Sequence, residues 1–188
     1  MDESYIQNIL TGDIQAFRYL VNKYKDRAFN LSRSIVISDL DAEEAIQDAF
    51  IQAYCNLSKF KARASFSTWF YRIVVNESLK KNKKKKLQYI PIDEVSRKDT
   101  IPDIRTEAIE HLHQEEQKEI INEVLEKLKE TECLLLKLHY LEEKKMDEIS
   151  EITGLTLSNC KVILYRARKN FAEIYEKIVN HSHMYHGR

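Results

Sequence analysis

Apolar residues recur at intervals of three and four along most of the chain, a spacing that places them on one face of an α-helix. The first such stripe comprises Ile14, Phe17, Val21, Tyr24, Ala28, Leu31 and Ile35. Gly12 ends a shorter helix before it, and Asp13 is a suitable N-cap. A second helix is predicted to begin near Asp41, and a third near Ser65 or Ser67, either of which could cap it.

The periodicity lapses between residues 87 and 112, and both prolines of the chain, Pro91 and Pro102, fall in this stretch. Proline fixes one backbone angle and lacks an amide donor, so the stretch is predicted to be an extended linker. The two parts of the chain that it joins need not touch.

Apolar periodicity resumes at Ile120, and Thr131 is the expected N-cap of the helix that follows. A short helix over residues 146–153, a turn at Gly154 and a long final helix come next. This order of short helix, glycine turn and long helix is typical of a helix-turn-helix unit.

Glycine and proline, which end helices and turn strands, number only 3 and 2 in 188 residues. We therefore predict an all-α fold made of two small helical domains, residues 1–86 and 113–180. A flexible linker at residues 87–112 joins them, and a disordered tail at 181–188 follows.

The composition argues against several classes of protein. No run approaches the roughly 18 apolar residues of a membrane span, and the N-terminus lacks a signal peptide, so a cytoplasmic protein is expected. Cys55, Cys133 and Cys160 are odd in number and far apart, and are predicted to be small core residues. No phosphate loop, paired metal histidines or nucleophile elbow is present. We expect no catalytic residue, no metal and no other cofactor.

The formal net charge of +0 conceals a separation of charge along the chain. Lysines crowd residues 80–86, whereas acidic residues gather at 39–48. A neutral chain with such poles can meet nucleic acid on one surface and a basic protein on another.

The final helix presents a mixed polar and basic face opposite its apolar stripe, at about 100° per residue. This face holds Ser158, Lys161, Val162, Tyr165 and Lys169, with Asn159 and Arg166 on its flanks. Cations suit phosphates, and the polar and small apolar groups suit base edges in a major groove. Val162 and Ile163 are apolar where a DNA-reading face is usually polar, so they meet either thymine methyl groups or a protein.

Aromatic residues alternate with Lys and Arg between Phe60 and Asn76. Such interleaving suits single-stranded nucleic acid, because aromatic rings stack on bases while cations follow the phosphates. The predicted core stripe comprises Phe66, Trp69, Phe70 and Ile73, and a second group off that stripe comprises Tyr71, Arg72, Val75 and Asn76. This second group is therefore a candidate binding surface, which the lysine run extends.

Taken together, these segments resemble the extracytoplasmic-function sigma factors, the smallest class of bacterial sigma factors. Residues 12–24 resemble the start of the family's region 2, and residues 41–50 its polymerase-binding helix. Residues 60–76 resemble its promoter-melting segment, and residues 148–168 its region 4. The order of these segments, with a linker between them, makes the resemblance specific.

The resemblance implies roles for particular residues. The clamp helices of the largest subunit of core RNA polymerase would be contacted by Glu44, Gln47, Asp48 and Tyr54. The melted minus-ten strand would be held by Phe60, Lys61, Tyr71, Arg72, Asn76, Lys80 and Lys83. The minus-thirty-five duplex would be read by Ser158, Asn159, Lys161, Val162, Tyr165 and Arg166.

Many members of this family are controlled by an anti-sigma factor, and the sequence leaves open whether this chain has one. Val162 and Ile163 depart from the polar or basic residues of the family, so recruitment of region 4 by another protein is a further hypothesis. A free-standing helix-turn-helix regulator is the main alternative, but it leaves the aromatic and basic segment and the acidic helix without a role. An adaptor that binds only proteins is a second alternative, and it has no need of the lysine run.

Overall fold

The structure of the protein is a computed structural model, which describes residues 2–82 and 115–185. The expected linker at 87–112 and Lys83 lie outside the described residues. The N-terminal half contains α1 (Asp2–Leu10), α2 (Gln15–Ser32), α3 (Asp39–Asn56), the short η1 (Leu57–Lys59) and α4 (Phe66–Lys81). The C-terminal half contains α6 (Glu115–Lys127), α7 (Glu130–Leu136), the π-helix η3 (Lys137–Leu141), α8 (Met146–Thr153) and α9 (Leu157–Tyr185).

Side-chain caps define where the N-terminal helices begin. The Asp13 carboxylate accepts hydrogen bonds from the Gln15 amide at 2.9 Å and the Ala16 amide at 3.3 Å, although Ile14 is the residue directly before α2. Ser38 caps α3, which therefore begins at Asp39, two residues before the predicted start. Ser65 caps α4 by accepting from the Thr68 amide, which decides between the two candidate serines.

In the C-terminal half, the predicted turn at Gly154 is confirmed, whereas the predicted N-cap at Thr131 is wrong. Gly154 adopts the left-handed conformation (φ 73°) at the end of α8, as a glycine turn requires. Thr131 is not an N-cap, because α7 already begins at Glu130. The final helix α9 continues to Tyr185, so most of the tail predicted to be disordered is helical, and residues 186–188 lie outside the described residues.

The core of the N-terminal half is formed by aromatic rings from α2, α3 and α4. Tyr24 packs against Phe66 at 5.4 Å between ring centroids, and Phe70 packs against Phe50 at 4.7 Å. Ile14, predicted to lie on the buried stripe, is 65% exposed, because it precedes the first turn of α2. Cys55 is exposed and so is not a core residue, whereas Cys133 and Cys160 are buried as predicted.

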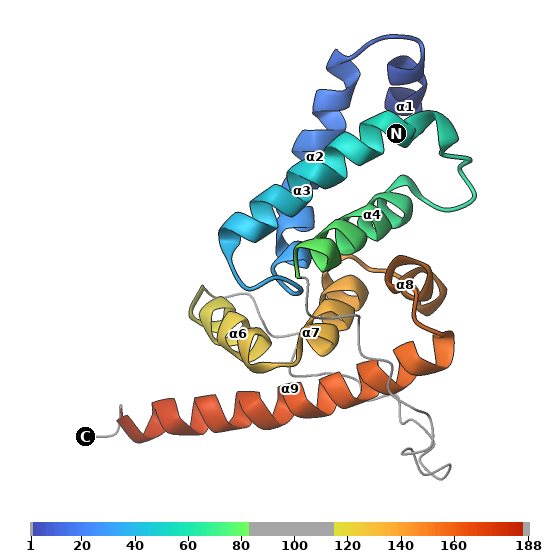
Figure 1. Ribbon diagram of the computed structural model, residues 1–188. Coiled ribbons are helices and arrows are strands. Elements are labelled where there is room, and N and C mark those ends of the chain that lie inside the picture. The colour runs from blue at the N-terminus through green and yellow to red at the C-terminus, as the bar shows by residue number, and fades with distance from the viewer. Residues whose placement is uncertain (1, 83–114, 186–188) are drawn as a thin grey trace.

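The two halves pack directly against each other in this structure. Figure 1 shows α4 lying above α7 and α8, while the long α9 runs beneath them across the base of the molecule. The contact between α4 and α8 is among the most extensive between any two helices of the described chain. Their packing determines which residues of α4 reach solvent.

Candidate nucleic-acid interface

One exposed strip follows the outer side of α4. Arg72, Asn76 and Lys80 are all exposed and are spaced four residues apart, so they line up along the helix. The Lys80 ammonium donates a hydrogen bond to Glu77 at 2.6 Å. The strip therefore offers two cations and an amide on one continuous surface, a composition that suits a nucleic-acid backbone and its bases.

Tyr71, predicted to belong to the same surface, lies instead beneath the C-terminal half. Its side chain and that of Val75 are both 0% exposed. The Tyr71 hydroxyl donates a hydrogen bond to Glu142, and the Lys144 ammonium lies 5.8 Å from the centre of its ring. Burial raises the pKa of Glu142 above its usual range, although Tyr71 and the charge of Arg27 act in the opposite direction. Periodicity within α4 could not reveal this burial, because the covering residues come from the other half of the chain.

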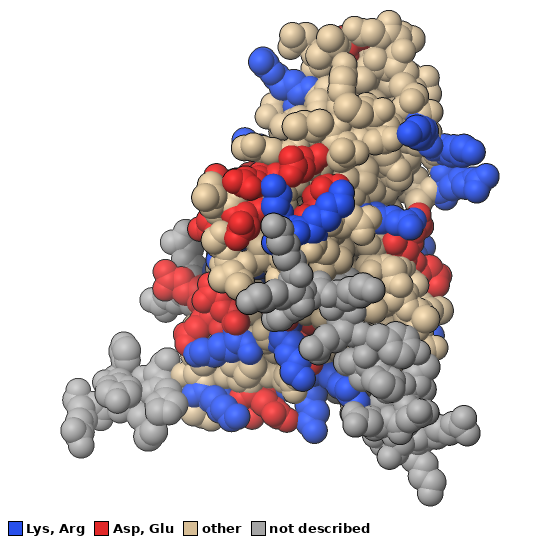
Figure 2. All heavy atoms as spheres, in the orientation of Figure 1, with Lys and Arg blue, Asp and Glu red and all other residues tan. Residues whose placement is uncertain are grey.

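The loop before α4 supplies the remaining candidates for single-stranded DNA. The Phe60 ring is half-buried and packs on Trp69 at 5.3 Å and on Phe66 at 5.9 Å. Lys61 and Arg63 are exposed on either side of Ala62, whose φ is 50°. Figure 2 shows Lys and Arg side chains projecting at the edge of the molecule, beside the loop that joins α3 to α4.

A polar cluster between α4 and α8 is absent from the sequence-based prediction. The Thr68 hydroxyl donates to Glu148 at 2.5 Å, and the Lys144 ammonium donates to Ser67 at 2.6 Å. Lys144 is also 3.5 Å from Glu148. Burial acts to raise the pKa of Glu148, but the hydrogen bonds from Thr68 and the Lys145 amide and the charge of Lys144 outweigh it and lower the pKa. Only the spacing of Lys144 and Glu148 is visible in the sequence, and it does not indicate a partner 77 residues away.

The predicted polymerase-binding residues lie on the outer surface of α3. Glu44 and Asp48 both pair with Lys81 of α4, at 3.0 and 3.1 Å, and Gln47 beside them is exposed. Tyr54, 42% exposed, makes an edge contact with Phe17 at 5.1 Å between centroids. Figure 2 shows acidic side chains gathered over the N-terminal part of α3, with a few basic ones beside them.

The predicted duplex-reading residues at the start of α9 fall into two groups that differ in solvent exposure. Ser158 and Lys161 are exposed, and Val162, Tyr165 and Arg166 are partly exposed. Asn159 is only 1% exposed, and its side-chain nitrogen has no hydrogen-bond partner among the described residues.

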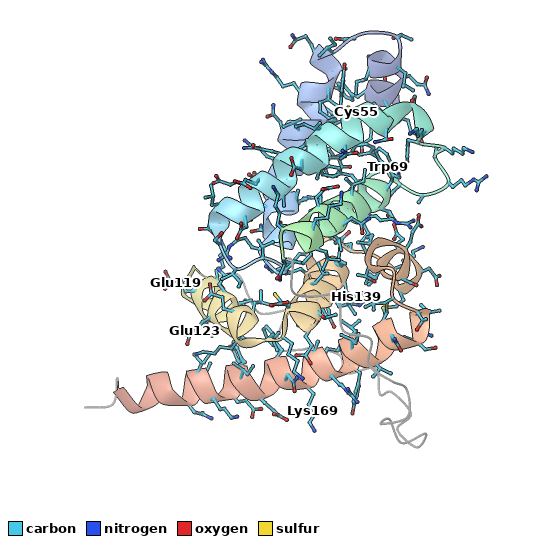
Figure 3. All side chains as sticks on the ribbon, viewed as in Figure 1. Cys55, Trp69, Glu119, Glu123, His139 and Lys169 are labelled. Carbon is cyan, nitrogen blue, oxygen red and sulfur yellow. The ribbon has the colours of Figure 1, made fainter. Side chains whose placement is uncertain are left out.

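Two further side chains of α9 clarify which of its faces is available. Ile163 is 1% exposed, so it is a core residue. The sequence-based expectation that it lies on the outer face beside Val162 is wrong. Lys169 points away from the other helices in Figure 3, which places the outer face of α9 on the underside of the molecule.

Two family models match the chain, one on each half. Sigma-70 region 2 matches residues 20–87, and sigma-70 region 4 matches residues 118–171. The extracytoplasmic-function sigma factor SigW of Bacillus subtilis is 29% identical over 175 residues, which cover 90% of this chain and 94% of SigW. The chain belongs to the extracytoplasmic-function sigma factors.

Other relatives agree with this assignment, and the chain is a sigma factor that directs transcription initiation. The sigma-E factor of Haemophilus influenzae is 26% identical over 175 residues, covering 89% of this sigma factor and 92% of its own chain. The sigma-E factor of Escherichia coli is 37% identical over 75 residues, which cover 40% of this chain and 39% of its own.

Solved structures share the fold of this sigma factor. CnrH, solved in complex with the cytosolic domain of CnrY, matches with a TM-score of 0.64 at 19% identity, covering 94% of this chain and 97% of CnrH. The sigma factor RpoE of Bartonella quintana, solved with the anti-sigma factor NepR, matches with a TM-score of 0.62 at 14% identity. That match covers 87% of this chain and 98% of RpoE. The all-α fold of two helical domains is confirmed.

The described residues contain neither a membrane span nor a metal cluster. Within 2–82 and 115–185, no helix has the length and apolar character to cross a membrane. The same residues contain no group of three or more His, Cys, Asp or Glu side chains that could hold a metal ion.

Proposed function

We propose that this sigma factor divides initiation between its two domains. Region 2, residues 1–86, binds core RNA polymerase and captures the melted minus-ten strand, and region 4, residues 113–180, reads the minus-thirty-five duplex. Residues 87–112 join them. The observation that carries the proposal is the exposed strip of α4. Its two cations and its amide face solvent, where they can contact the phosphates and bases of a DNA strand.

On the minus-ten side, the exposed strip and the α3–α4 loop form the strand-binding surface. Arg72, Lys80 and Lys61 pair with phosphates, and Asn76 hydrogen-bonds to an unpaired base. A base extracted from the duplex loses a few kcal/mol of stacking, which a contact with the Phe60 ring offsets. Tyr71 takes part as a second stacking ring once region 4 has moved away. Lys83, which lies outside the described residues, is a further proposed contact of the strand.

The experiment that tests this surface is promoter melting on permanganate-probed DNA with the reconstituted holoenzyme. Asn76→Ala and Arg72→Ala should lose reactive thymines around the start site while polymerase binding stays intact. Asn22→Ala, an exposed asparagine on α2, is the matched control and should melt the promoter normally. Normal melting by both α4 variants, or loss of polymerase binding by either, would contradict the assignment.

The partner of α3 is proposed to be the clamp helices of the largest polymerase subunit. Glu44, Gln47 and Asp48 form an acidic and polar surface, which suits a basic partner, and Tyr54 adds an exposed aromatic ring. The protein then acts in the cytoplasm with polymerase and promoter DNA, and the catalysis belongs to the polymerase. An anti-sigma factor is a further proposed partner, because a fold neighbour was solved with one.

Region 4 is proposed to enter the major groove with the first turns of α9. Lys161 and Arg166 serve phosphates, and Ser158, Val162 and Tyr165 face base edges. Asn159 can join them only after its side chain leaves its present buried position.

One observation favours a variant of this role for region 4. Val162 is apolar and partly exposed on the outer face of α9, which fits recruitment of region 4 by another protein as well as it fits contact with DNA. Mapping transcript starts on a genomic library with core polymerase separates the two. Starts that share upstream motifs at both elements support DNA reading, and starts that share only the minus-ten motif support recruitment. Absence of initiation and of polymerase binding would favour a free-standing regulator.

A further inference from the structure

A pocket of about 440 Å³ lies within region 4, between α6 and the π-helix η3. Figure 1 shows α6 and α7 both lying above α9, and α6 packs mainly on α9 and little on α7. Protein interiors are normally packed as closely as organic crystals, so a pocket of this size inside a small helical domain is uncommon. Its volume falls within the range of roughly 300–1,000 Å³ that is typical of small-molecule sites.

The walls of this pocket are chiefly aliphatic. They are formed by Ile121 and Leu125 of α6, Leu136 and Leu141 of the α7–η3 segment, and Phe171 of α9. Phe171 is 8% exposed and Leu141 is 60% exposed, so the pocket extends from the core of region 4 to its surface. A long apolar group placed along these walls would leave water, which is the main favourable contribution to apolar binding.

One wall has an unusual backbone. The Glu142 amide donates a hydrogen bond to the Lys137 carbonyl at 3.0 Å, which closes the wide turn of η3. Turns of this kind are rare in proteins and are frequent at functional sites. In this chain the wide turn carries Tyr140 and Leu141, both of which line the pocket.

The charges around the pocket are positive. Lys118 and Lys137 belong to the lining, which includes no acidic residue. Lys118 is exposed, and the Lys137 ammonium donates to the Asn30 carbonyl at 2.9 Å, an acceptor that leaves its charge in place. Behind the wall, Arg168 donates to the Tyr140 hydroxyl at 2.7 Å. An anionic group is therefore favoured at the mouth of the pocket.

The acidic residues of α6 do not alter this conclusion. Glu119 and Glu123 lie on the side of α6 that faces away from α7 in Figure 3, and neither lines the pocket. Glu123 also pairs with Lys127 on the same helix. A protein partner would bury about 800 Å² on each side, which is more surface than the walls of this pocket present.

We propose that this pocket of region 4 is a binding site for a free medium-chain fatty acid. The acyl chain lies along Leu125 and Leu136 toward Phe171, and the carboxylate pairs with Lys118 and Lys137 at the mouth. The aliphatic walls select the chain, and the two ammonium groups select an anionic head group over a neutral or cationic one. The site is separate from the residues proposed to contact DNA and polymerase.

The test is isothermal titration calorimetry of the full chain with sodium decanoate, below the concentration at which decanoate forms micelles. One decanoate should bind per chain. Across hexanoate, octanoate and decanoate, the affinity should rise about fourfold per methylene group, which is the effect of burying one such group. Decylammonium, which has the same chain and the opposite charge, should bind about tenfold more weakly than decanoate or worse.

Two variants, each with a matched control, locate the site. Lys118→Glu should weaken decanoate binding about tenfold or more, whereas Lys177→Glu, the same change at an exposed position of α9, should leave it unchanged. Leu141→Trp adds bulk at the mouth and should also weaken binding. Leu40→Trp, at an exposed leucine of α3, should have no effect. Far-ultraviolet circular dichroism verifies that each variant keeps its helices.

Methyl-selective NMR of the wild type identifies the contacted side chains independently of any variant. Decanoate should shift the methyl signals of Ile121, Leu125 and Leu136. Absence of binding, more than one decanoate per chain, or equal affinity for decylammonium would overturn the proposal. Methyl shifts centred on Ile37 and Leu40 instead would mean that decanoate adheres to exposed apolar residues, and would overturn it as well.

Discussion

The hydroxyl of Tyr71 donates a hydrogen bond to the carboxylate of Glu142, which lies 71 residues further along the chain. The contact joins the proposed strand-binding helix of region 2 to the segment that precedes the helix-turn-helix of region 4. It also separates two properties of one side chain. The hydroxyl contributes to the packing of the two halves, whereas the aromatic ring is the part that can stack on a base.

Tyr71→Phe should therefore weaken the packing of the two halves and preserve initiation. A hydrogen bond to a charged group contributes roughly 1.5–3 kcal/mol, so the free energy of unfolding should fall by an amount in this range. The ring remains, so promoter melting by the holoenzyme should stay near the wild-type level. Denaturant unfolding and permanganate probing measure the two effects. Loss of melting in Tyr71→Phe would show that the hydroxyl itself acts on the promoter.

Glu142 and Glu148 should make opposite contributions to the pH dependence of stability. The pKa of Glu148 is lowered, so its stabilisation is complete above the usual glutamate value of 4.5 and is lost as pH falls through the lowered value. The pKa of Glu142 is raised, so its ionised form costs stability above the raised value, and the cost disappears as pH falls below 4.5.

Thermal unfolding from neutral to acidic pH measures this contrast. The destabilisation caused by Glu148→Gln should shrink as the pH falls, because the wild-type carboxylate becomes protonated. The wild type should gain stability relative to Glu142→Gln over the same range. Parallel profiles for the two variants would contradict the assigned shifts.

Gln47→Lys should lower the affinity for core polymerase, because it places a cation in the acidic surface proposed to meet a basic partner. Gln7→Lys, at an exposed position of α1, makes the same chemical change on another helix, and it should bind normally. Biolayer interferometry with immobilised core polymerase measures both, and the loss for Gln47→Lys should decrease at high salt. Equal affinity of the two variants would place the docking surface elsewhere.

Gly154→Ala should destabilise region 4 through its backbone alone. The φ of Gly154 is +73°, and a methyl group added there would meet no atom within 4 Å. The cost is thus the left-handed conformation itself, about 1–2 kcal/mol for an L-residue with a Cβ atom. Asparagine tolerates this conformation better, so Gly154→Asn should lose less. Denaturant unfolding in which Ala and Asn variants both equal the wild type would contradict this account.

Local features were predictable from the sequence wherever their cause lies within a few residues. The Ser65 cap and the left-handed turn at Gly154 depend on neighbouring backbone groups, and both are confirmed. Asp13 accepts from the first amides of α2, but the residue directly before that helix is Ile14. Errors of the same kind were small. The predicted start of α3 is two residues late because Ser38 is the cap, and the predicted cap Thr131 is wrong because α7 begins at Glu130.

The candidate sites were harder to place, because exposure depends on what the rest of the chain covers. The periodicity of α4 separates its own core face correctly, with Phe66 and Phe70 inside. It cannot show that Tyr71, on another face, is covered by Glu142 and Lys144. The same applies to Asn159 and Ile163 of α9, which were expected near solvent and are buried.

The amino-acid order thus sets the helices, their caps, the family and the two-domain division, because these follow from short-range periodicity, capping and motifs. Which face of α4 is open, and which charges of region 4 cover it, follows from the packing of α4 on α8. That packing joins Thr68 to Glu148 and Tyr71 to Glu142 across 80 and 71 residues. No local pattern encodes contacts at such separations, since they depend on which helices of the two halves pack together.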